Sequence, residues 1–266
     1  MDLIVDGRRV FAGTGGRPLE QDRPLIVLLH GAGMDHTVWV LQARFLAHHG
    51  FSVLAVDMPA HGRSEGEPLT TIDAMADWVA QAIAATGFPR TSLVGHSMGA
   101  AVALSTAARA PERVEKLALL GASLAMPVHP VLLESSKAGT QLTPELMTFW
   151  GLGRTSQVGG HPTPGLWLTG AARRLIQKGV GPSLAADLQA CADWKGGPDA
   201  AARTRAPTLV FAGSEDRMVQ ASKTREMAKA IQGADIVTIP ASGHMMMLEA
   251  PDATVDALNR FLGGKQ

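Results

Sequence analysis

Residues 91–99, Thr91-Ser92-Leu93-Val94-Gly95-His96-Ser97-Met98-Gly99, decide the fold of this chain. Residues 91–94 predict a strand, and a helical pattern begins at Ala100, so the glycine-flanked serine lies at a strand-to-helix turn. Such a turn forces a strained backbone on Ser97, and side chains two residues to either side would collide with it. Glycine at 95 and 99 removes that collision. We therefore expect the Ser97 hydroxyl at a strand end, beside the N–H groups of a helix N-terminus.

Strands and helices alternate on both sides of this turn. Short apolar runs predict further strands at 25–29, 51–56, 116–120, 208–212 and 235–239. Helical patterns fall between them at 37–49, 72–86, 100–109, 222–232 and 252–262, the last capped by Gly263. This alternation predicts an α/β fold with a mostly parallel sheet flanked by helices. Residues 2–20 predict a two-stranded opening, with the glycine cluster 13–16 in its hairpin.

Residues 122–205 differ in character, because they carry helical patterns and no convincing strand. We expect them to form an inserted helical cap between core segments 1–121 and 206–266. A total of 266 residues agrees with this division, since one α/β unit often takes roughly 200 to 250 residues.

Composition narrows the class of protein. Lys and Arg number 24, as do Asp and Glu, so no basic excess is available for nucleic acid. Apolar residues make up 46% and charged residues 18%, which favours a globular chain. The apolar run 25–29 is too short to span a membrane, residues 1–9 are too charged for a signal peptide, and Cys191 has no disulfide partner. We expect a cytoplasmic protein with a small-molecule substrate and neither nucleic-acid nor membrane partner; its oligomeric state is left open.

A serine hydroxyl becomes a strong nucleophile only when a base takes its proton and an acid orients that base. His244 follows the predicted strand 235–239, and Asp216 follows the predicted strand 208–212. Because parallel strands end at one edge of a sheet, we expect both side chains near Ser97. The alternative for Ser97 is a serine that only caps a helix.

These residues, together with His30-Gly31-Ala32-Gly33 and residues 57–64, resemble the α/β-hydrolase superfamily, which carries Ser, Asp and His in this order. The resemblance spans nearly the whole chain and weakens in residues 122–205, the position of the family's variable cap. It implies a triad of Ser97 as nucleophile, His244 as general base and Asp216 as orienting acid. It also implies an oxyanion hole formed by the backbone N–H groups of Ala32 and Met98.

Neighbouring polar residues have simpler interpretations. Glu215 competes with Asp216 for the role of the acid, but the short acid at the loop tip matches the family, and we expect Glu215 to be solvated. Asp57 stands in a proline- and glycine-containing segment that predicts a structural turn. His30 and His96 are expected to hold loops through hydrogen bonds.

Neither a metal nor a cofactor is expected. The sequence has no H-E-x-x-H motif and no pair of cysteines. The glycine cluster 13–16 does not precede a helix of a βαβ unit, so it does not predict a nucleotide-binding loop.

Serine at the turn also restricts the reaction. Dehalogenases and epoxide hydrolases of the superfamily use aspartate there, and the chain has no tyrosine to activate an epoxide. Esters, thioesters, lactones and the carbon–carbon bond of a vinylogous diketone remain open, since all react through acyl attack and oxyanion stabilisation. The leading hypothesis is a carboxylesterase of medium-sized apolar esters. The alternatives are a carbon–carbon bond hydrolase of ring-cleavage diketones and a non-catalytic, hydrolase-like small-molecule receptor.

The predicted cap supplies the hint about substrate. Trp150, Trp167 and Trp194 lie in it and are expected to line an apolar pocket. The alternative is that these tryptophans only pack the cap helices against the core.

Overall fold

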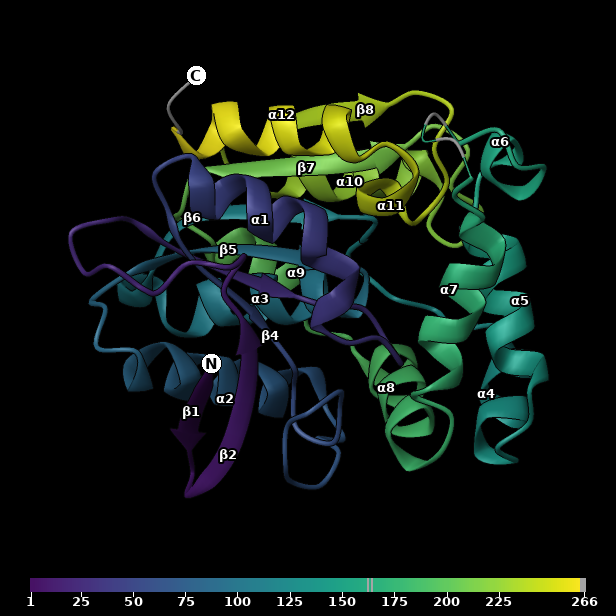
Figure 1. Cartoon of the computed structure of the whole chain (residues 1–266), viewed down its shortest axis with the longest axis horizontal. Helices are drawn as coiled ribbons and strands as arrows, with labels where there is room; N and C mark the ends of the chain where they lie inside the picture. The colour runs from purple at the N-terminus through teal and green to yellow at the C-terminus, as the bar shows by residue number, and fades with distance from the viewer. Residues whose placement is uncertain (162, 164, 264–266) are drawn as a thin grey trace.

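The computed structural model describes residues 1–161, 163 and 165–263, and these fold around an eight-stranded sheet (Figure 1). The strand order is β1-β2-β4-β3-β5-β6-β7-β8. The β1–β2 and β2–β4 pairs are antiparallel, and every pair from β4 to β8 is parallel. The strands are β1(Asp2–Val5), β2(Arg8–Gly13), β3(Leu25–Leu29), β4(Ser52–Val56), β5(Thr91–His96), β6(Val114–Leu120), β7(Thr208–Gly213) and β8(Asp235–Ile239). The predicted α/β fold with a mostly parallel sheet is confirmed.

The central strands are buried along their whole length. Every residue of β3, β4, β5 and β7 is buried, as expected for parallel strands that carry helices on both faces. Strand β5 lies between β3 and β6 in the middle of the sheet. Its carboxyl end, and with it Ser97, is therefore held on both sides by hydrogen-bonded strands.

Helices cover both faces of the sheet (Figure 1). On one side α1(Val40–His48) contacts α12(Pro251–Leu262), which ends at Gly263 with a left-handed backbone as predicted. On the other side α2(Ile72–Ala85) contacts α3(Met98–Arg109). The short 3-10 helices η1(His36–Trp39) and η2(Pro111–Arg113) precede α1 and β6.

Residues 122–205, called the insertion below, contain six helices and no strand among their described residues, and most of these helices gather beyond one end of the sheet (Figure 1). This group comprises α4(Pro130–Lys137), α5(Leu142–Gly151), α6(Arg154–Gln157), α7(Leu168–Gln177) and α8(Pro182–Asp193). The next helix, α9(Gly197–Arg203), instead packs against α3 and α10(Ala221–Ala230) of the core. Pro162 and Pro164 of the predicted cap, and residues 264–266 of the predicted core, lie outside the described residues.

The opening hairpin differs from the prediction. Its turn is at Asp6 and Gly7, whose φ angles are 49° and 73°, and the glycine cluster 13–16 instead begins at the last residue of β2. Two successive residues with positive φ form the tight turn that matches the twist of two antiparallel strands. An Asp-Gly pair is the sequence typical of such a turn, so residues 6 and 7 carried the correct signal and the glycine cluster was given more weight than they were.

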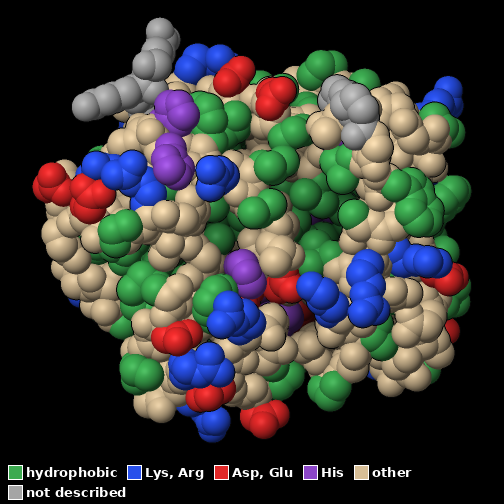
Figure 2. All heavy atoms as spheres, viewed as in Figure 1, with side chains coloured by type: hydrophobic (Ala, Val, Ile, Leu, Met, Phe, Trp, Pro, Cys, Tyr) green, Lys and Arg blue, Asp and Glu red, His purple; other side chains and the backbone are tan. Residues whose placement is uncertain are grey.

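The surface shows no separation of charge on the face in Figure 2, where acidic and basic side chains are interspersed. Among the described residues, no helix is both long and apolar enough to cross a membrane.

The N-terminus of α2 offers a test of the fold. The Thr71 hydroxyl accepts a hydrogen bond of 3.0 Å from the Ala74 N–H, so it satisfies a donor that the helix itself leaves free. We expect Thr71→Ala to lower the free energy of unfolding by about 1 kcal/mol in urea denaturation. The neighbouring substitution Thr70→Ala, at an exposed residue, is the control, and equal stability of the two variants would contradict the assignment of this cap.

Candidate active site

The turn that carries Ser97 has the strained geometry that the sequence predicts. Ser97 has φ 54° and ψ −117° at the start of α3. A Cβ atom on Gly95 would lie 2.2 Å from the Gly99 carbonyl oxygen, and one on Gly99 would lie 2.4 Å from the Leu29 oxygen. The Ser97 N–H donates to the Leu120 oxygen at 2.8 Å, which ties the turn to β6. The serine is thus held in a left-handed conformation by backbone on all sides.

His244 and Asp216 form a buried pair. Asp216 follows β7 and His244 follows β8, and His244 Nδ1 lies 2.8 Å from Asp216 Oδ2. The other carboxylate oxygen accepts hydrogen bonds of 2.8 Å from the N–H groups of Met218 and Val219. Because Asp216 accepts at both oxygens, it fixes the imidazole with its Nδ1 proton toward the acid.

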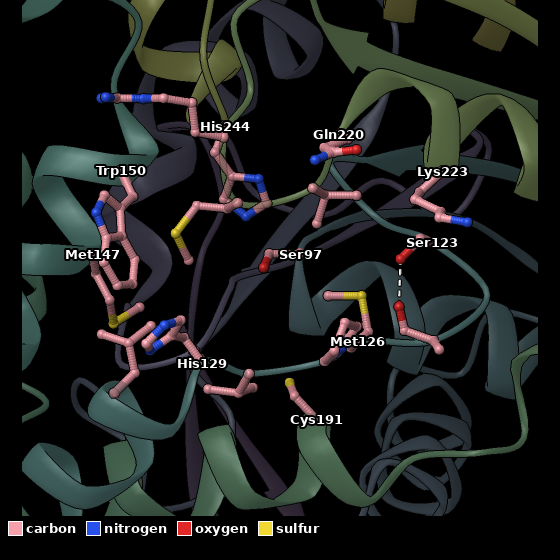
Figure 3. Close-up of a pocket in the computed structure, with 18 of the residues that line it drawn as sticks. Ser97, Ser123, Met126, His129, Met147, Trp150, Cys191, Gln220, Lys223 and His244 are labelled. Atoms are coloured by element: carbon pink, nitrogen blue, oxygen red, sulfur yellow. Dashed lines mark hydrogen bonds between the residues drawn. The ribbon is translucent and has the colours of Figure 1, made fainter.

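Ser97 and His244 line the same cavity, and Figure 3 shows both side chains turned into it. His244 Nε2 is buried and has no hydrogen-bond partner among the described residues. With Nδ1 occupied by Asp216, Nε2 is the nitrogen left to accept a proton. The structure therefore brings together the three side chains of the predicted triad at the carboxyl edge of the sheet.

The loop that carries His244 is fixed by its neighbours. The His244 carbonyl oxygen lies 3.0 Å from Nε2 of His96, and the His244 N–H donates to the Gly151 oxygen at 2.7 Å. His96 is the residue before Ser97, so it joins the serine turn directly to the histidine loop. Gly121, at φ 60°, lies under the ring, where a Cβ atom would be 2.9 Å from Cε1 and Nδ1 of His244. No pattern in the sequence predicts this role of Gly121.

Glu249 is a second residue that the sequence analysis missed. Its buried carboxylate accepts hydrogen bonds from the N–H groups on either side of His244, namely Gly243 at 3.0 Å and Met245 at 3.2 Å. Its other oxygen accepts from the Gly153 N–H, in the inserted segment, at 2.7 Å. Burial raises the pKa of Glu249 even though these hydrogen bonds favour the charged form. One carboxylate thus holds the histidine loop and the insertion together.

The predicted oxyanion donors lie on either side of Ser97. Ala32, in the loop after β3, lines the cavity, and Met98 is the first residue of α3, whose N–H has no partner within the helix. His30 supports this loop: its Nδ1 lies 2.9 Å from the Gly31 oxygen, and its Nε2 accepts from the Met58 N–H at 3.2 Å. Burial lowers the pKa of His30 to about 4, so its ring is neutral near pH 7.

The cavity has a volume of about 790 Å³ and is largely apolar. Trp150 and Met147 from α5 lie on one side of Ser97 in Figure 3, and Gln220 and Lys223 lie on the other. Cys191 of α8 also lines it, but burial raises the pKa of this thiol, so it stays protonated.

Of the three tryptophans predicted to line a pocket, the structure brings only Trp150 to this cavity. The Trp167 side chain is 61% exposed and lies against its own helix, where a Cβ atom on Gly170 would be 2.3 Å from the indole. Trp194 is buried at the end of α8, with its Nε1 beside Gly196. The prediction was wrong for Trp167 and Trp194, which pack locally against neighbouring backbone.

His129 was not predicted, yet it reaches the cavity. Its Nδ1 accepts from the Val131 N–H at 3.3 Å, and its ring meets Trp150 edge-on, with 5.5 Å between centroids. Its sequence context, a histidine before a proline, contains no signal for this position.

Glu215 also differs from the prediction. It is half-buried, and its carboxylate accepts a hydrogen bond of 2.6 Å from the Arg154 N–H. It therefore serves to hold the insertion and is not a freely solvated side chain.

Asp35, His36 and Asp57 are the group of described residues that could hold a metal ion, with one ligand atom from each within 4.8 Å of the others. Asp57 already accepts from the N–H groups of His36 at 2.6 Å and Arg63 at 2.9 Å. Burial raises the pKa of Asp57, but hydrogen bonds from His36 and Arg63 outweigh it and leave that pKa below its usual value. These contacts are those of a structural turn.

Known proteins resemble this chain over most of its length. A model of the alpha/beta hydrolase family matches residues 26–257. The (E)-2-((N-methylformamido)methylene)succinate hydrolase of Acinetobacter baylyi is 23% identical over 244 residues, which are 89% of this chain and 89% of that protein. The enol-lactonase from Burkholderia xenovorans LB400 superposes with a TM-score of 0.87 at 22% identity, over 99% of this chain and 100% of that one. A thermophilic esterase superposes with a TM-score of 0.81 at 27% identity, over 99% and 96% of the two chains.

The contacts of Glu249 lead to a prediction of stability. Glu249→Gln replaces an acceptor oxygen by an amide that cannot accept from buried N–H groups. We expect the free energy of unfolding to fall by about 2 kcal/mol in urea denaturation. Glu145→Gln, at an exposed glutamate of α5, is the matched control and should have little effect. Wild-type stability of the Glu249 variant would show that these hydrogen bonds contribute nothing measurable.

A substitution at Gly121 can separate the effect of backbone strain from that of contact with the His244 ring. Gly121 and Gly139 have similar φ angles, 60° and 64°, but a Cβ atom on Gly139 would meet nothing within 4 Å. Alanine at either site should cost about 1 kcal/mol of stability through backbone strain. Only Gly121→Ala should displace the His244 ring, and we expect it to lower kcat for hydrolysis about 100-fold. Equal activity of the two variants would contradict this role of Gly121.

Proposed function

The chain belongs to the alpha/beta hydrolase family, and we propose that it acts there as a serine hydrolase, a carboxylesterase of medium-sized apolar esters. The observation that carries the proposal is the 2.8 Å contact between His244 Nδ1 and Asp216 Oδ2, with Nε2 buried and unpaired among the described residues in the cavity that Ser97 lines. This arrangement supplies a base of fixed orientation beside a hydroxyl.

In the proposed reaction, Ser97 Oγ attacks the ester carbonyl while His244 Nε2 takes the hydroxyl proton. Asp216 stabilises the imidazolium that forms. The N–H groups of Ala32 and Met98 donate to the oxyanion of the tetrahedral intermediate. Such donors lower the barrier because they stabilise the negative charge that develops there. The C–O bond to the alcohol then breaks, and His244 returns the proton to the leaving oxygen. A water molecule then attacks the acyl-serine while His244 takes its proton. The bond to Ser97 Oγ breaks, His244 returns the proton to Oγ, and the carboxylic acid product leaves.

The cavity supports a medium-sized apolar substrate. Its volume of about 790 Å³ lies within the range of small-molecule sites, roughly 300 to 1,000 Å³. Methionine, leucine and tryptophan side chains form much of its wall, including Met126, Leu132, Met147, Trp150 and Leu188. Methionines adapt to different acyl shapes at little cost, which favours a range of esters. The similarity to an esterase at 27% identity agrees with this choice.

The decisive experiment combines covalent labelling with two substrates. We expect a fluorophosphonate probe to label the purified protein, Ser97→Ala to abolish labelling, and the wild type to hydrolyse p-nitrophenyl butyrate. Absence of labelling and turnover would overturn the proposal in favour of a binding protein. Turnover of a yellow dienolate but not of the ester would assign a carbon–carbon bond hydrolase instead.

Asp216 provides a quantitative test of the same mechanism. Asp216→Asn keeps the shape of the side chain but favours the wrong tautomer of His244, so kcat should fall about 10⁴-fold. Asp235→Asn, at an exposed aspartate of β8, should retain wild-type kcat. A loss of less than tenfold for Asp216→Asn in steady-state kinetics would remove Asp216 from the proposed triad.

A further inference from the structure

Asp187 is a carboxylate of the insertion that is buried against the core. It lies on α8 and is 0% exposed. Its Oδ2 accepts a hydrogen bond of 2.9 Å from the Gly33 N–H and lies 2.8 Å from His61 Nε2. Both partners belong to core loops at the carboxyl edge of the sheet. Gly33 directly follows Ala32, one of the two proposed oxyanion donors.

The surroundings of His61 favour its charged form. Its Nδ1 lies 2.9 Å from the Pro59 carbonyl oxygen, and its Nε2 faces the Asp187 carboxylate. Since a carbonyl and a carboxylate are both acceptors, the form with protons on both ring nitrogens satisfies both contacts. Burial lowers the pKa of His61, but the hydrogen bond and charge of Asp187 outweigh burial and raise it above its ordinary value. The insertion is therefore joined to the core by a buried imidazolium–carboxylate pair.

The insertion also encloses Gly33 sterically. Gly33 has φ 66°, and a Cβ atom there would lie 2.7 Å from Cδ1 of Leu184, one turn before Asp187 on α8. A Cβ atom on Gly179, in the turn before α8, would lie 2.5 Å from the Gly33 oxygen. Gly33 is thus held at its N–H by Asp187 and enclosed at its carbonyl oxygen by the α7–α8 turn.

Stability alone does not account for Asp187. Its Oδ1 is buried and has no hydrogen-bond partner among the described residues. Buried ion pairs often contribute no net stability compared with apolar residues of similar volume, and an unsatisfied carboxylate oxygen makes this pair more costly still. A charged residue here is better explained by what it does to the loop at residues 31–34.

We propose that Asp187 is a positioning residue that, paired with His61, fixes the Ala32–Gly33 segment and so aims the Ala32 N–H at the developing oxyanion. This inference rests on the proposed serine hydrolase function. It assigns to the insertion a part in the chemical step, in addition to its part in forming the cavity. Without the carboxylate, the Gly33 N–H loses its acceptor and the loop gains freedom next to Ser97.

The first measurement requires no catalysis. Asp187→Asn keeps the side-chain shape but removes the charge that holds His61. We expect amide hydrogen exchange at Ala32 and Gly33, followed by NMR on the whole chain, to become about tenfold faster or more. Two variants of the same helix are controls: Asp193→Asn at an exposed aspartate, and Ala190→Gly, which weakens α8 without touching residue 33. His61→Gln, which keeps a donor toward Asp187 without the charge, replaces Asp187→Asn if that variant does not fold.

The second measurement separates positioning from binding. With p-nitrophenyl butyrate, Asp187→Asn should lower kcat about 10- to 100-fold and change KM less than about threefold, since only transition-state stabilisation is lost. Affinity for a phenylalkyl trifluoromethyl ketone, which forms an oxyanion adduct with serine, should fall equally. Affinity for the corresponding alcohol, which forms no such adduct, should not change.

The outcomes distinguish this inference from the proposed function. Exchange at residues 32 and 33 that matches the two controls overturns the role of Asp187, whatever the activity. Faster exchange with unchanged kcat and ketone affinity also overturns it. Faster exchange in a protein that is inert toward esters and unlabelled by fluorophosphonate overturns the serine hydrolase proposal, and leaves Asp187 only as an anchor of the loop.

Discussion

The backbone of Ser97 is the constraint on which the site depends. A left-handed conformation at a non-glycine residue is costly, and it persists only where the surroundings leave no alternative. Here Gly95 and Gly99 bring backbone so close that a Cβ atom at either position would lie about 2.2 to 2.4 Å from a carbonyl oxygen. Strands β3 and β6 flank the turn, and the Ser97 N–H is bound to β6. The serine is placed by the sheet, and the remaining groups are arranged around it.

Two buried carboxylates then join the insertion to this arrangement. Glu249 binds the N–H groups around His244 together with that of Gly153, and Asp187 binds Gly33 together with His61. Each contacts a different loop next to Ser97. The insertion is therefore coupled to the loop of the histidine as well as to the loop of Ala32, and a shift of its helices would be felt at both.

Sequence predicted those parts of the structure that depend on local rules. The alternation of buried strands with helices identified the α/β fold, and the glycines around Ser97 identified the strained turn. Parallel strands ending at one edge brought Asp216 and His244 together, since that placement follows from topology alone. The hairpin turn at Asp6 and Gly7 was missed because the glycine cluster 13–16 was taken as the turn, although an Asp-Gly pair is itself typical of a tight hairpin.

Parts that depend on tertiary packing were not predictable. Trp150, Trp167 and Trp194 all lie in residues 122–205, and sequence does not distinguish them. Whether an indole faces a cavity or its own helix depends on how the helices are rotated and packed. Asp187, Gly121 and, through its bond to Gly153, Glu249 act through contacts 96 to 154 residues away in sequence, in segments without a recognisable motif. Glu249 lies only five residues after His244, but spacing alone does not reveal that its carboxylate turns back to the loop.

The glycine beneath the His244 ring has a consequence for how this scaffold can diverge. Position 121 directly follows β6, the strand next to β7, and would be a natural place to transplant the acid of the triad. Any side chain there meets the imidazole that it is meant to serve, and it must also take up a left-handed backbone. A single substitution at this position therefore cannot relocate the acid. Either a designer or natural evolution would first have to lengthen the loop that follows β6.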